Sequence, residues 1–179
     1  MEQKGRPYRV EKYNPEWKTL YEKERAIILN VFGGIALRVE HIGSTSVEEL
    51  WAKPQIDILV VVDSLSLVDS LVDAMVAEGY NYHGESVVPG EKYFTRDAST
   101  GERLVSVHVC SKDNERSISS IYFRDYLRSN SEDRDLYSKT KIQAYDSGKT
   151  DREDYPAKKK EVSESIKEKA KKWHEAQEK

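Results

Sequence analysis

The residues best suited to chemistry in this sequence form a glycine-serine turn followed by a lysine. Gly43 and Ser44 come directly after an apolar stretch, and Thr45 adds a second hydroxyl group. In such a turn the backbone N–H groups converge on an anion, and the start of a following helix adds a favourable dipole. Lys53 lies a little further along the chain, where its ammonium group can meet a phosphate as a point charge. These four residues predict a phosphate-binding site.

An aspartate inside an apolar run adds a second kind of chemistry. Asp57 lies within residues 56–62, where a carboxylate is costly unless it binds a metal ion or a cation. Nucleotidyltransferases place two carboxylates two residues apart on a strand, so that both hold divalent ions on one face. Here Gln55 occupies the position of the other carboxylate, and its neutral oxygen is a weaker ligand. We expect a site for Mg²⁺ or Mn²⁺ that departs from the standard two-metal arrangement.

A histidine on a second apolar run is the natural partner of this aspartate. Ser106 and His108 share one face of residues 104–110. If that strand lies beside the strand of Asp57, His108 takes the place of a third carboxylate. Asp57 and His108 are then the predicted catalytic pair, either as a base with its orienting partner or as a mononuclear metal site. The predicted metal ligands are Asp57, Gln55 and His108.

Each of these polar residues also has a purely structural interpretation. His41, which precedes the turn, and His108 can both be hydrogen-bonded histidines that serve the fold alone. Asp57 can form a buried ion pair with Lys53 or Arg96. The sequence alone leaves these alternatives open.

The apolar pattern predicts the elements that hold these residues in place. Continuous apolarity over residues 56–62 is typical of a strand buried on both faces, hence a central strand. Asn14 and Pro15 are typical of a helix start. We expect a short edge strand over 8–13, helices from Asn14-Pro15 to Gly33-Gly34, over 47–51 and over 64–78, and strands over 35–42, 56–62, 80–82, 92–95 and 104–110.

The chain as a whole fits a single domain. It has 179 residues, of which 37% are hydrophobic and 34% charged, enough for a core and too apolar for disorder. The pattern changes to charged helices near residue 117. We expect an α/β (α+β) domain over 1–179, with a mixed central sheet over about 8–112 and a C-terminal helical layer over about 115–179.

Charge and hydropathy exclude several classes of partner. The net charge of −3 does not favour nucleic acid or acidic lipid, and no apolar stretch is long enough to span a bilayer. The N-terminus lacks a secretion signal, and the single cysteine, Cys110, allows no internal disulfide. We therefore expect a cytoplasmic protein without nucleic-acid or membrane partners. The oligomeric state stays open.

Several stretches in a fixed order resemble the GrpB family over nearly the whole chain. They are residues 39–47 (VEHIGSTSV), 52–58 (AKPQIDI), 107–109 (VHV) and 123–128 (FRDYLR), with Tyr137, Lys141 and Tyr155. The resemblance implies a nucleotidyltransferase-like fold in a small bacterial-type protein. Related domains are also fused to dephospho-coenzyme A kinase, which suggests nucleotide or coenzyme A metabolism.

The resemblance also carries over individual site residues. The signature positions are His41, Gly43, Ser44, Lys53, Asp57, His108 and Arg124. We accordingly add His41 and Arg124 to the predicted phosphate- and nucleotide-binding residues. The chain departs from the family pattern at Glu48-Glu49, where Pro-Gly is common, and at Ser106, where another histidine is not unusual.

Three functions are consistent with these observations. The first is transfer of a nucleotidyl or phosphoryl group to a small molecule, using a nucleotide and a divalent metal. The second is a non-catalytic module that binds a nucleotide or another phosphorylated small molecule, which the missing second carboxylate favours. The third is an accessory protein that binds a partner through its charged C-terminal helices.

Overall fold

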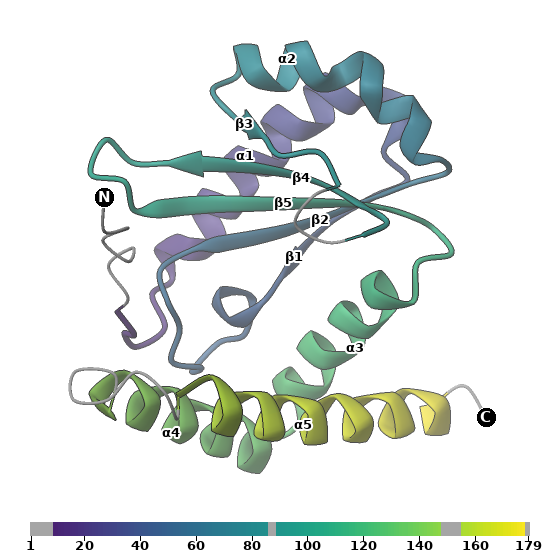
Figure 1. Cartoon of the computed structure of the whole chain (residues 1–179). Helices are drawn as coiled ribbons and strands as arrows, with labels where there is room; N and C mark the ends of the chain where they lie inside the picture. Colours follow the sequence, from purple (N-terminus) through teal and green to yellow (C-terminus); the bar gives the residue numbers. More distant parts are fainter. Residues whose placement is uncertain (1–8, 86–88, 148–154, 178–179) are drawn as a thin grey trace.

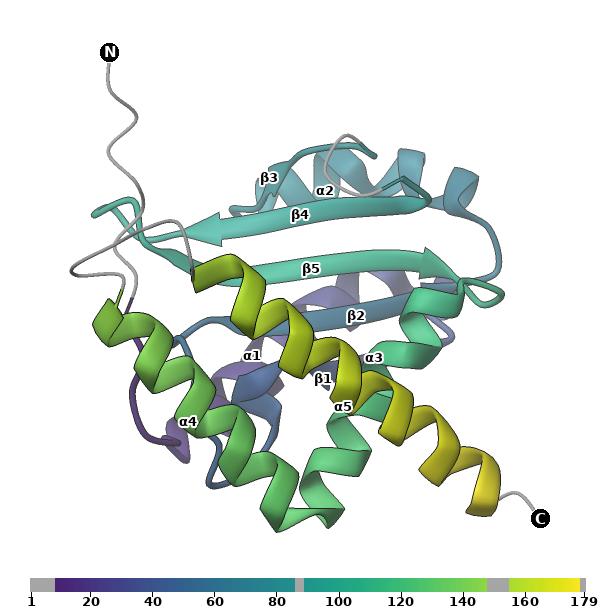
Figure 2. The same cartoon turned by 60° about the horizontal axis from the view of Figure 1, so that its bottom comes forward.

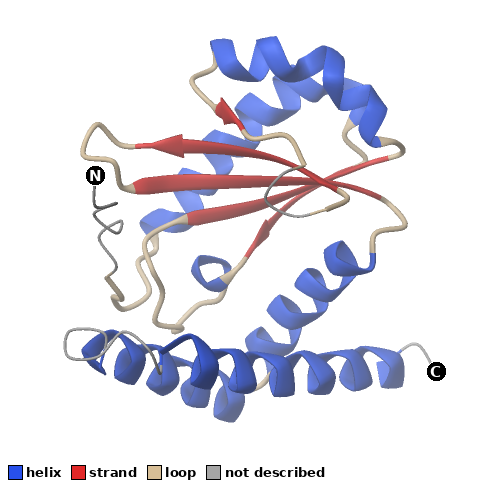
Figure 3. Cartoon of the chain, viewed as in Figure 1, coloured by secondary structure: helices blue, strands red, loops and turns tan. Residues whose placement is uncertain are grey.

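The computed structural model describes residues 9–85, 89–147 and 155–177. Its centre is a five-stranded mixed sheet in the order β1-β2-β5-β4-β3. Strands β2 and β5 are parallel, and the other neighbouring pairs are antiparallel. The strands are β1 (Arg38–Ile42), β2 (Ile56–Val62), β3 (Asn81–Tyr82), β4 (Glu91–Asp97) and β5 (Arg103–Ser111). The predicted mixed α/β architecture is confirmed, with the strands at the centre and the helices around them (Figure 3).

Helices α1 (Glu16–Phe32) and α2 (Val72–Ala77) cover one face of the sheet (Figure 1). Asn14 caps the start of α1, because its Oδ1 accepts a hydrogen bond from the backbone N–H of Glu16 at 2.9 Å. The apolar side of α1 packs with every second residue of β2, from Ile56 to Val62, in the largest core cluster. The strand over 56–62 is therefore an inner strand, as its continuous apolarity predicts.

The C-terminal helices form a second cluster. Helices α3 (Glu115–Ser129), α4 (Ser131–Ser147) and α5 (Tyr155–Gln177) pack on one another around Leu127 and Ile166. Figure 2 shows α4 and α5 beside each other, on the side of the sheet away from α1. Helix α3 reaches the sheet through Ile121, which packs on Leu59 of β2. None of the described helices is long and apolar enough to cross a membrane.

Several predicted boundaries are wrong. The strand expected over 35–42 begins only at Arg38, because residues 33–35 form a 3₁₀ turn. The helix expected over 64–78 is a 3₁₀ helix over 65–71 followed by the short α2. Of the edge strand expected over 8–13, the described part forms one bridge, between Glu11 and Ala52.

The helix expected over 47–51 is absent, and these residues form turns instead. Glu49 has a φ of +65°, in the left-handed region that a right-handed helix does not pass through. This is one of the two positions at which the chain departs from the Pro-Gly of the resembling family. Val47 and Leu50 anchor this turn, because their side chains are buried among the C-terminal helices.

Candidate functional site

The Gly43-Ser44 turn lies directly against Asp57. Gly43 has a φ of +71°, and a Cβ atom at this position would lie 2.5 Å from Asp57 Oδ2. The register explains this contact, because Ile42 at the end of β1 pairs with Asp57 near the start of β2. Glycine is therefore required here both by the backbone conformation and by the close approach of the carboxylate.

The turn leaves its first N–H groups without protein acceptors. The backbone N–H groups of Ser46 and Val47 donate to the carbonyls of Gly43 and Ser44, at 3.2 and 3.3 Å. Within the described part of the chain, the N–H groups of Gly43, Ser44 and Thr45 donate to no protein acceptor. Unpaired N–H groups at a glycine-containing turn are typical of an anion-binding site.

Lys141 of α4 brings a positive charge to this turn. Its Nζ donates to Ser44 Oγ and to the carbonyl of Trp51, the latter at 3.2 Å. The same ammonium group lies 4.4 Å from the ring centroid of Tyr137, which helps to hold it in place. Chemical reasoning from the sequence did not select Lys141 as a site residue, because it lies 97 residues away from Ser44 along the chain.

Asp57 is half-buried and bound to the glutamine beside it. Gln55 Nε2 donates to Asp57 Oδ1 at 2.7 Å and to Ser106 Oγ at 3.0 Å. Burial raises the pKa of Asp57 above its usual range, although the Gln55 amide and the charges of His108, Lys141 and Lys53 act to lower it. The carboxyl group is thus shifted toward accepting a proton, while nearby cations favour its charged form.

His108 lies on the same face of the sheet as Asp57. Strands β2 and β5 pair so that Asp57 is opposite Ser106 and His108 is opposite Leu59. His108 Nδ1 is 3.0 Å from Glu91 Oε2, and Glu91 also forms an ion pair with Arg116 at 3.2 Å. The alternation of residues 104–110 predicted that Ser106 and His108 share a face, and the pairing of β2 with β5 puts that face on the same side of the sheet as Asp57.

Glu91 is a residue that sequence reasoning missed. Burial alone would raise the pKa of Glu91, but the His108 hydrogen bond and the Arg116 charge hold it below its usual range. A charged Glu91 accepts a hydrogen bond from His108 Nδ1–H, which fixes the orientation of the ring. The Nε2 atom has no hydrogen-bond partner among the described residues. The alternation of β4 could have placed Glu91 on one face, but only the pairing of β4 with β5 brings it to His108.

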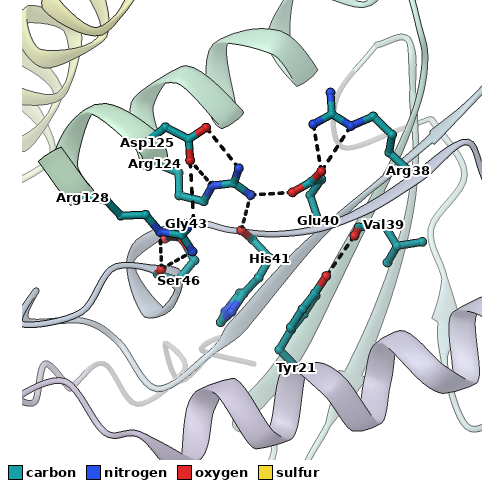
Figure 4. A network of polar contacts seen from close by, with 10 residues as sticks. All are labelled: Tyr21, Arg38, Val39, Glu40, His41, Gly43, Ser46, Arg124, Asp125 and Arg128. Atoms are coloured by element: carbon teal, nitrogen blue, oxygen red, sulfur yellow. Dashed lines mark hydrogen bonds and ion pairs between the residues drawn. The ribbon is translucent and has the colours of Figure 1, made fainter.

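Two predicted site residues lie elsewhere. His41 faces the opposite side of the sheet, where its ring stacks on Tyr21 of α1 with centroids 4.7 Å apart. Arg124 of α3 donates to Glu40 at 2.7 Å and to the carbonyl of His41 at 3.1 Å, and it also pairs with Asp125. Figure 4 shows the His41 ring directed toward Tyr21 while Arg124 approaches β1 from the helix α3 side. His41 therefore faces away from Asp57, whereas Arg124 lies on the Asp57 face of the sheet but is bonded to Glu40 and Asp125, not to the Gly43-Ser44 turn.

The donor set limits the metal chemistry of the site. Among the described residues, no group of three or more His, Cys, Asp or Glu side chains could hold a metal ion. The Gln55 side chain presents its N–H₂ group, not its oxygen, to Asp57. A two-metal site does not fit these residues, whereas a single Mg²⁺ can be bound by one carboxylate together with substrate phosphates and water.

The profile of the GrpB protein family matches residues 7–169. The chain belongs to the GrpB family. It is 35% identical over 158 residues to UPF0157 protein SCO7215 of Streptomyces coelicolor, covering 88% of this chain and 81% of that protein. It is 37% identical over 130 residues to UPF0157 protein BH1888 of Halalkalibacterium halodurans, covering 72% of this chain and 65% of that protein. In UPF0157 protein YqkA of Bacillus subtilis the match spans 33% of the relative's length.

Solved structures show the same fold. The crystal structure of GrpB from Enterococcus faecalis has a TM-score of 0.80 and 33% sequence identity, covering 90% of this chain and 98% of that one. The Cid1 poly(U) polymerase with MgGTP bound has a TM-score of 0.54 and 13% identity, covering 81% of this chain and 46% of that one. The second likeness shows that this GrpB chain shares a nucleotidyltransferase-type fold, and at this identity it shows no more.

Proposed function

We propose that this GrpB protein binds the phosphate groups of a nucleotide or of another phosphorylated small molecule at the Gly43-Ser44 turn. The observation that carries the proposal is the Lys141 ammonium group, which is bonded to Ser44 Oγ beside a turn with unpaired N–H groups. A lysine held at a glycine-containing turn supplies both the charge and the donors that a phosphate requires. Lys53, which acts electrostatically on Asp57, adds a second positive charge to the same site.

Asp57 determines whether binding leads to transfer. Burial raises its pKa and Gln55 holds one of its oxygens, so the carboxyl group is oriented as well as shifted toward proton uptake. In a nucleotidyl or phosphoryl transfer, Asp57 would take the proton of the acceptor hydroxyl as that oxygen bonds to phosphorus. The phosphoanhydride bond to the leaving group, which is pyrophosphate or a nucleoside diphosphate respectively, would break in the same step. One Mg²⁺ or Mn²⁺ held by Asp57 and the substrate phosphates would supply charge neutralisation.

A binding module without turnover is the second candidate, and the glutamine at position 55 favours it. Its N–H₂ group donates to Asp57 in the position where nucleotidyltransferases have a second carboxylate. A site that keeps its phosphate donors but lacks one metal ligand retains its affinity for the phosphate group more readily than it retains a high rate of transfer. The two candidates share the same binding site and differ only in turnover, which releases pyrophosphate in nucleotidyl transfer and a nucleoside diphosphate in phosphoryl transfer.

Calorimetric titration with ATP, UTP and dephospho-coenzyme A, with and without Mg²⁺, tests the binding. Lys141→Gln and Ser44→Ala should each weaken binding at least about tenfold, since each removes a charged or hydroxyl contact worth ~1.5 kcal/mol or more. Lys139→Gln, on the exposed side of the same helix, is the matched control and should leave affinity unchanged. Absence of binding by all three compounds would contradict the proposal.

Assays for release of pyrophosphate and of nucleoside diphosphate then separate the two candidates. If the protein is a transferase, Asp57→Asn abolishes release while the fold is retained, because asparagine keeps the shape and removes only the charge. If it is a binding module, the wild-type protein binds the compound and releases neither pyrophosphate nor nucleoside diphosphate with any acceptor.

A further inference from the structure

A cavity lies beside the Gly43-Ser44 turn, at the edge of the sheet formed by β1. Its volume is about 650 Å³, within the usual range for small-molecule sites. The walls come from α1, from β1 and the turn that follows it, and from the facing ends of α3 and α4. Ser44, Asp57, His108 and Lys141 do not contribute to the lining, but Thr45 does, so this cavity adjoins the proposed phosphate site at the turn.

The floor of the cavity is an imidazole whose protonation is fixed by its neighbours. Thr45 Oγ1 donates its proton to the carbonyl of Gln55 at 3.0 Å. It must therefore accept the hydrogen bond that joins it to His41 Nε2, also at 3.0 Å. The proton of His41 is thus on Nε2, and Nδ1 is left with a free lone pair. Burial and the nearby Arg128 and Arg124 charges lower the pKa of His41 to about 4, so the ring is neutral at pH 7.

An arginine at the mouth of the cavity has N–H donors to spare. Arg128 Nε and Nη2 both donate to the carbonyl of Ser46, at 3.1 and 2.7 Å (Figure 4). Its Nη1 is 3.7 Å from an oxygen of Asp125, which is beyond ordinary hydrogen-bond distance. The side chain is 45% exposed, so a ligand carboxylate can approach it.

The other charges of the lining are balanced. Arg134 pairs with Glu49 at 2.5 Å. This leaves Lys18 and Arg128 as cations, with Glu22 and Glu48 as anions, around the neutral floor. Glu48 and Arg128 act with opposite sign on the pKa of Tyr13, which places a carboxylate and a guanidinium near the same wall. A dianionic phosphate would meet two carboxylates here, whereas a molecule that carries one charge of each sign would find partners for both.

We infer that this cavity binds a small zwitterion of the amino-acid type, with its carboxylate on Arg128 and its ammonium donors on His41 Nδ1 and Glu48. The ring of Tyr21, stacked on His41, supplies an apolar surface beside that ammonium group. The two sites adjoin at Thr45 but use different charged side chains, Arg128 and Glu48 here and Lys141 and Asp57 at the phosphate site.

The test is nuclear magnetic resonance titration of the full chain with pools of the proteinogenic amino acids, each at about 10 mM, which detects millimolar affinities. At least one amino acid should shift the His41 ring nitrogen resonances, and long-range ¹H–¹⁵N spectra should show the Nε2–H form. The analogues of that amino acid that lack either the carboxylate or the amine should bind at least about tenfold more weakly, because each loses one charged contact.

Two variants and two controls complete the test. His41→Gln keeps an N–H donor for Thr45 and removes the Nδ1 acceptor, and Arg128→Gln removes the cation; each should weaken binding at least about tenfold. Lys112→Gln, an exposed site away from the cavity, should bind as the wild type does. Asp57→Asn should also bind normally, which separates this site from the phosphate site. The inference would be overturned if no amino acid shifted the His41 resonances. It would also be overturned if His41→Gln and Arg128→Gln bound the amino acid as tightly as the wild type does.

Discussion

Gly43 shows how a single residue can couple backbone conformation to a functional group. Its left-handed φ directs the chain from β1 into the turn, and the missing Cβ leaves room for the Asp57 carboxylate. The same position therefore determines where the unpaired N–H groups of the turn lie relative to Asp57. A side chain here would disturb both halves of the proposed phosphate site.

Gly43→Ala should lower the free energy of unfolding by about 2 to 4 kcal/mol, from left-handed strain and from the clash with Asp57. Gly101→Ala is the matched control, because Gly101 has a φ of +82° and no atom within 4 Å of its added Cβ. That control should lose only the strain, ~1 kcal/mol. Urea denaturation measures both values, and equal losses would show that the Asp57 contact is unimportant.

His41 should make stability depend on pH. Its pKa is about 4 when folded, because burial disfavours the charged ring. In the unfolded chain a histidine has a pKa of about 6.5. Between these values the unfolded state binds the proton and the folded state does not, so stability falls as the pH is lowered from 6.5 toward 4.

Urea denaturation at pH 7 and at pH 4.5 should show a loss of about 2 to 3 kcal/mol attributable to this histidine. His41→Gln cannot take up the proton and should lack that part of the loss. Carboxylates such as Glu40 also titrate at low pH, so the comparison between the two proteins is the informative quantity. Identical pH profiles would contradict a neutral buried His41.

At the scale of elements, α3 is joined to the sheet by charge as well as by apolar packing. Arg124 is buried and donates to Glu40, to Asp125 and to the carbonyl of His41. Glu40 has a pKa below its usual range: burial acts to raise it, but Arg124 and Arg38 more than offset that effect. Helix α3 is therefore held in one position against β1, which in turn positions α4 and its Lys141.

Arg124→Ala should destabilise the protein by about 3 kcal/mol, because it leaves a partly buried carboxylate and a carbonyl without a donor. Arg124→Lys keeps the charge but loses the planar fork, so a smaller loss is expected. Lys112→Ala breaks the Lys112–Asp63 pair, in which both side chains are more than half exposed, and should not change the denaturation midpoint. A double-mutant cycle with Glu40→Gln measures the coupling, and a value near zero would refute a structural role for this ion pair.

In the whole molecule, the C-terminal helices and the turn after β1 share one apolar cluster. Val47 and Leu50 are buried against Leu127, Tyr137 and Ile166. Helices α4 and α5 thus pack mainly against the turn and against α3, and less against the sheet itself. The phosphate donors of the turn and the ammonium group of α4 are positioned by the same contacts.

A fragment of residues 1–114 should therefore not fold cooperatively. It would expose Val47, Leu50 and the sheet face around Leu59, each apolar side chain costing ~2 kcal/mol. Aggregation and the absence of a cooperative thermal transition are the expected results, measured by light scattering and circular dichroism. A soluble 1–114 fragment with a sharp transition would instead show two independent domains and contradict the predicted single domain over 1–179.

Local features of the sequence determined the elements and much of their burial. Continuous apolarity marked residues 56–62 as an inner strand, and alternation placed Ser106 and His108 on one face of β5. These predictions hold because a strand has a side-chain period of two wherever it pairs. The predicted helix over 47–51 failed because the left-handed φ of Glu49 depends on packing by residues distant in sequence.

Tertiary structure alone decided which polar side chains meet. His41 adjoins the turn in sequence, yet the register of β1 on β2 directs its ring to α1 and away from Asp57. Lys141 is far along the chain, yet the packing of α3 and α4 brings it to Ser44. Periodicity specifies the direction of a side chain relative to its own strand or helix, whereas the contacts between elements depend on strand register and helix packing, which involve the whole chain at once.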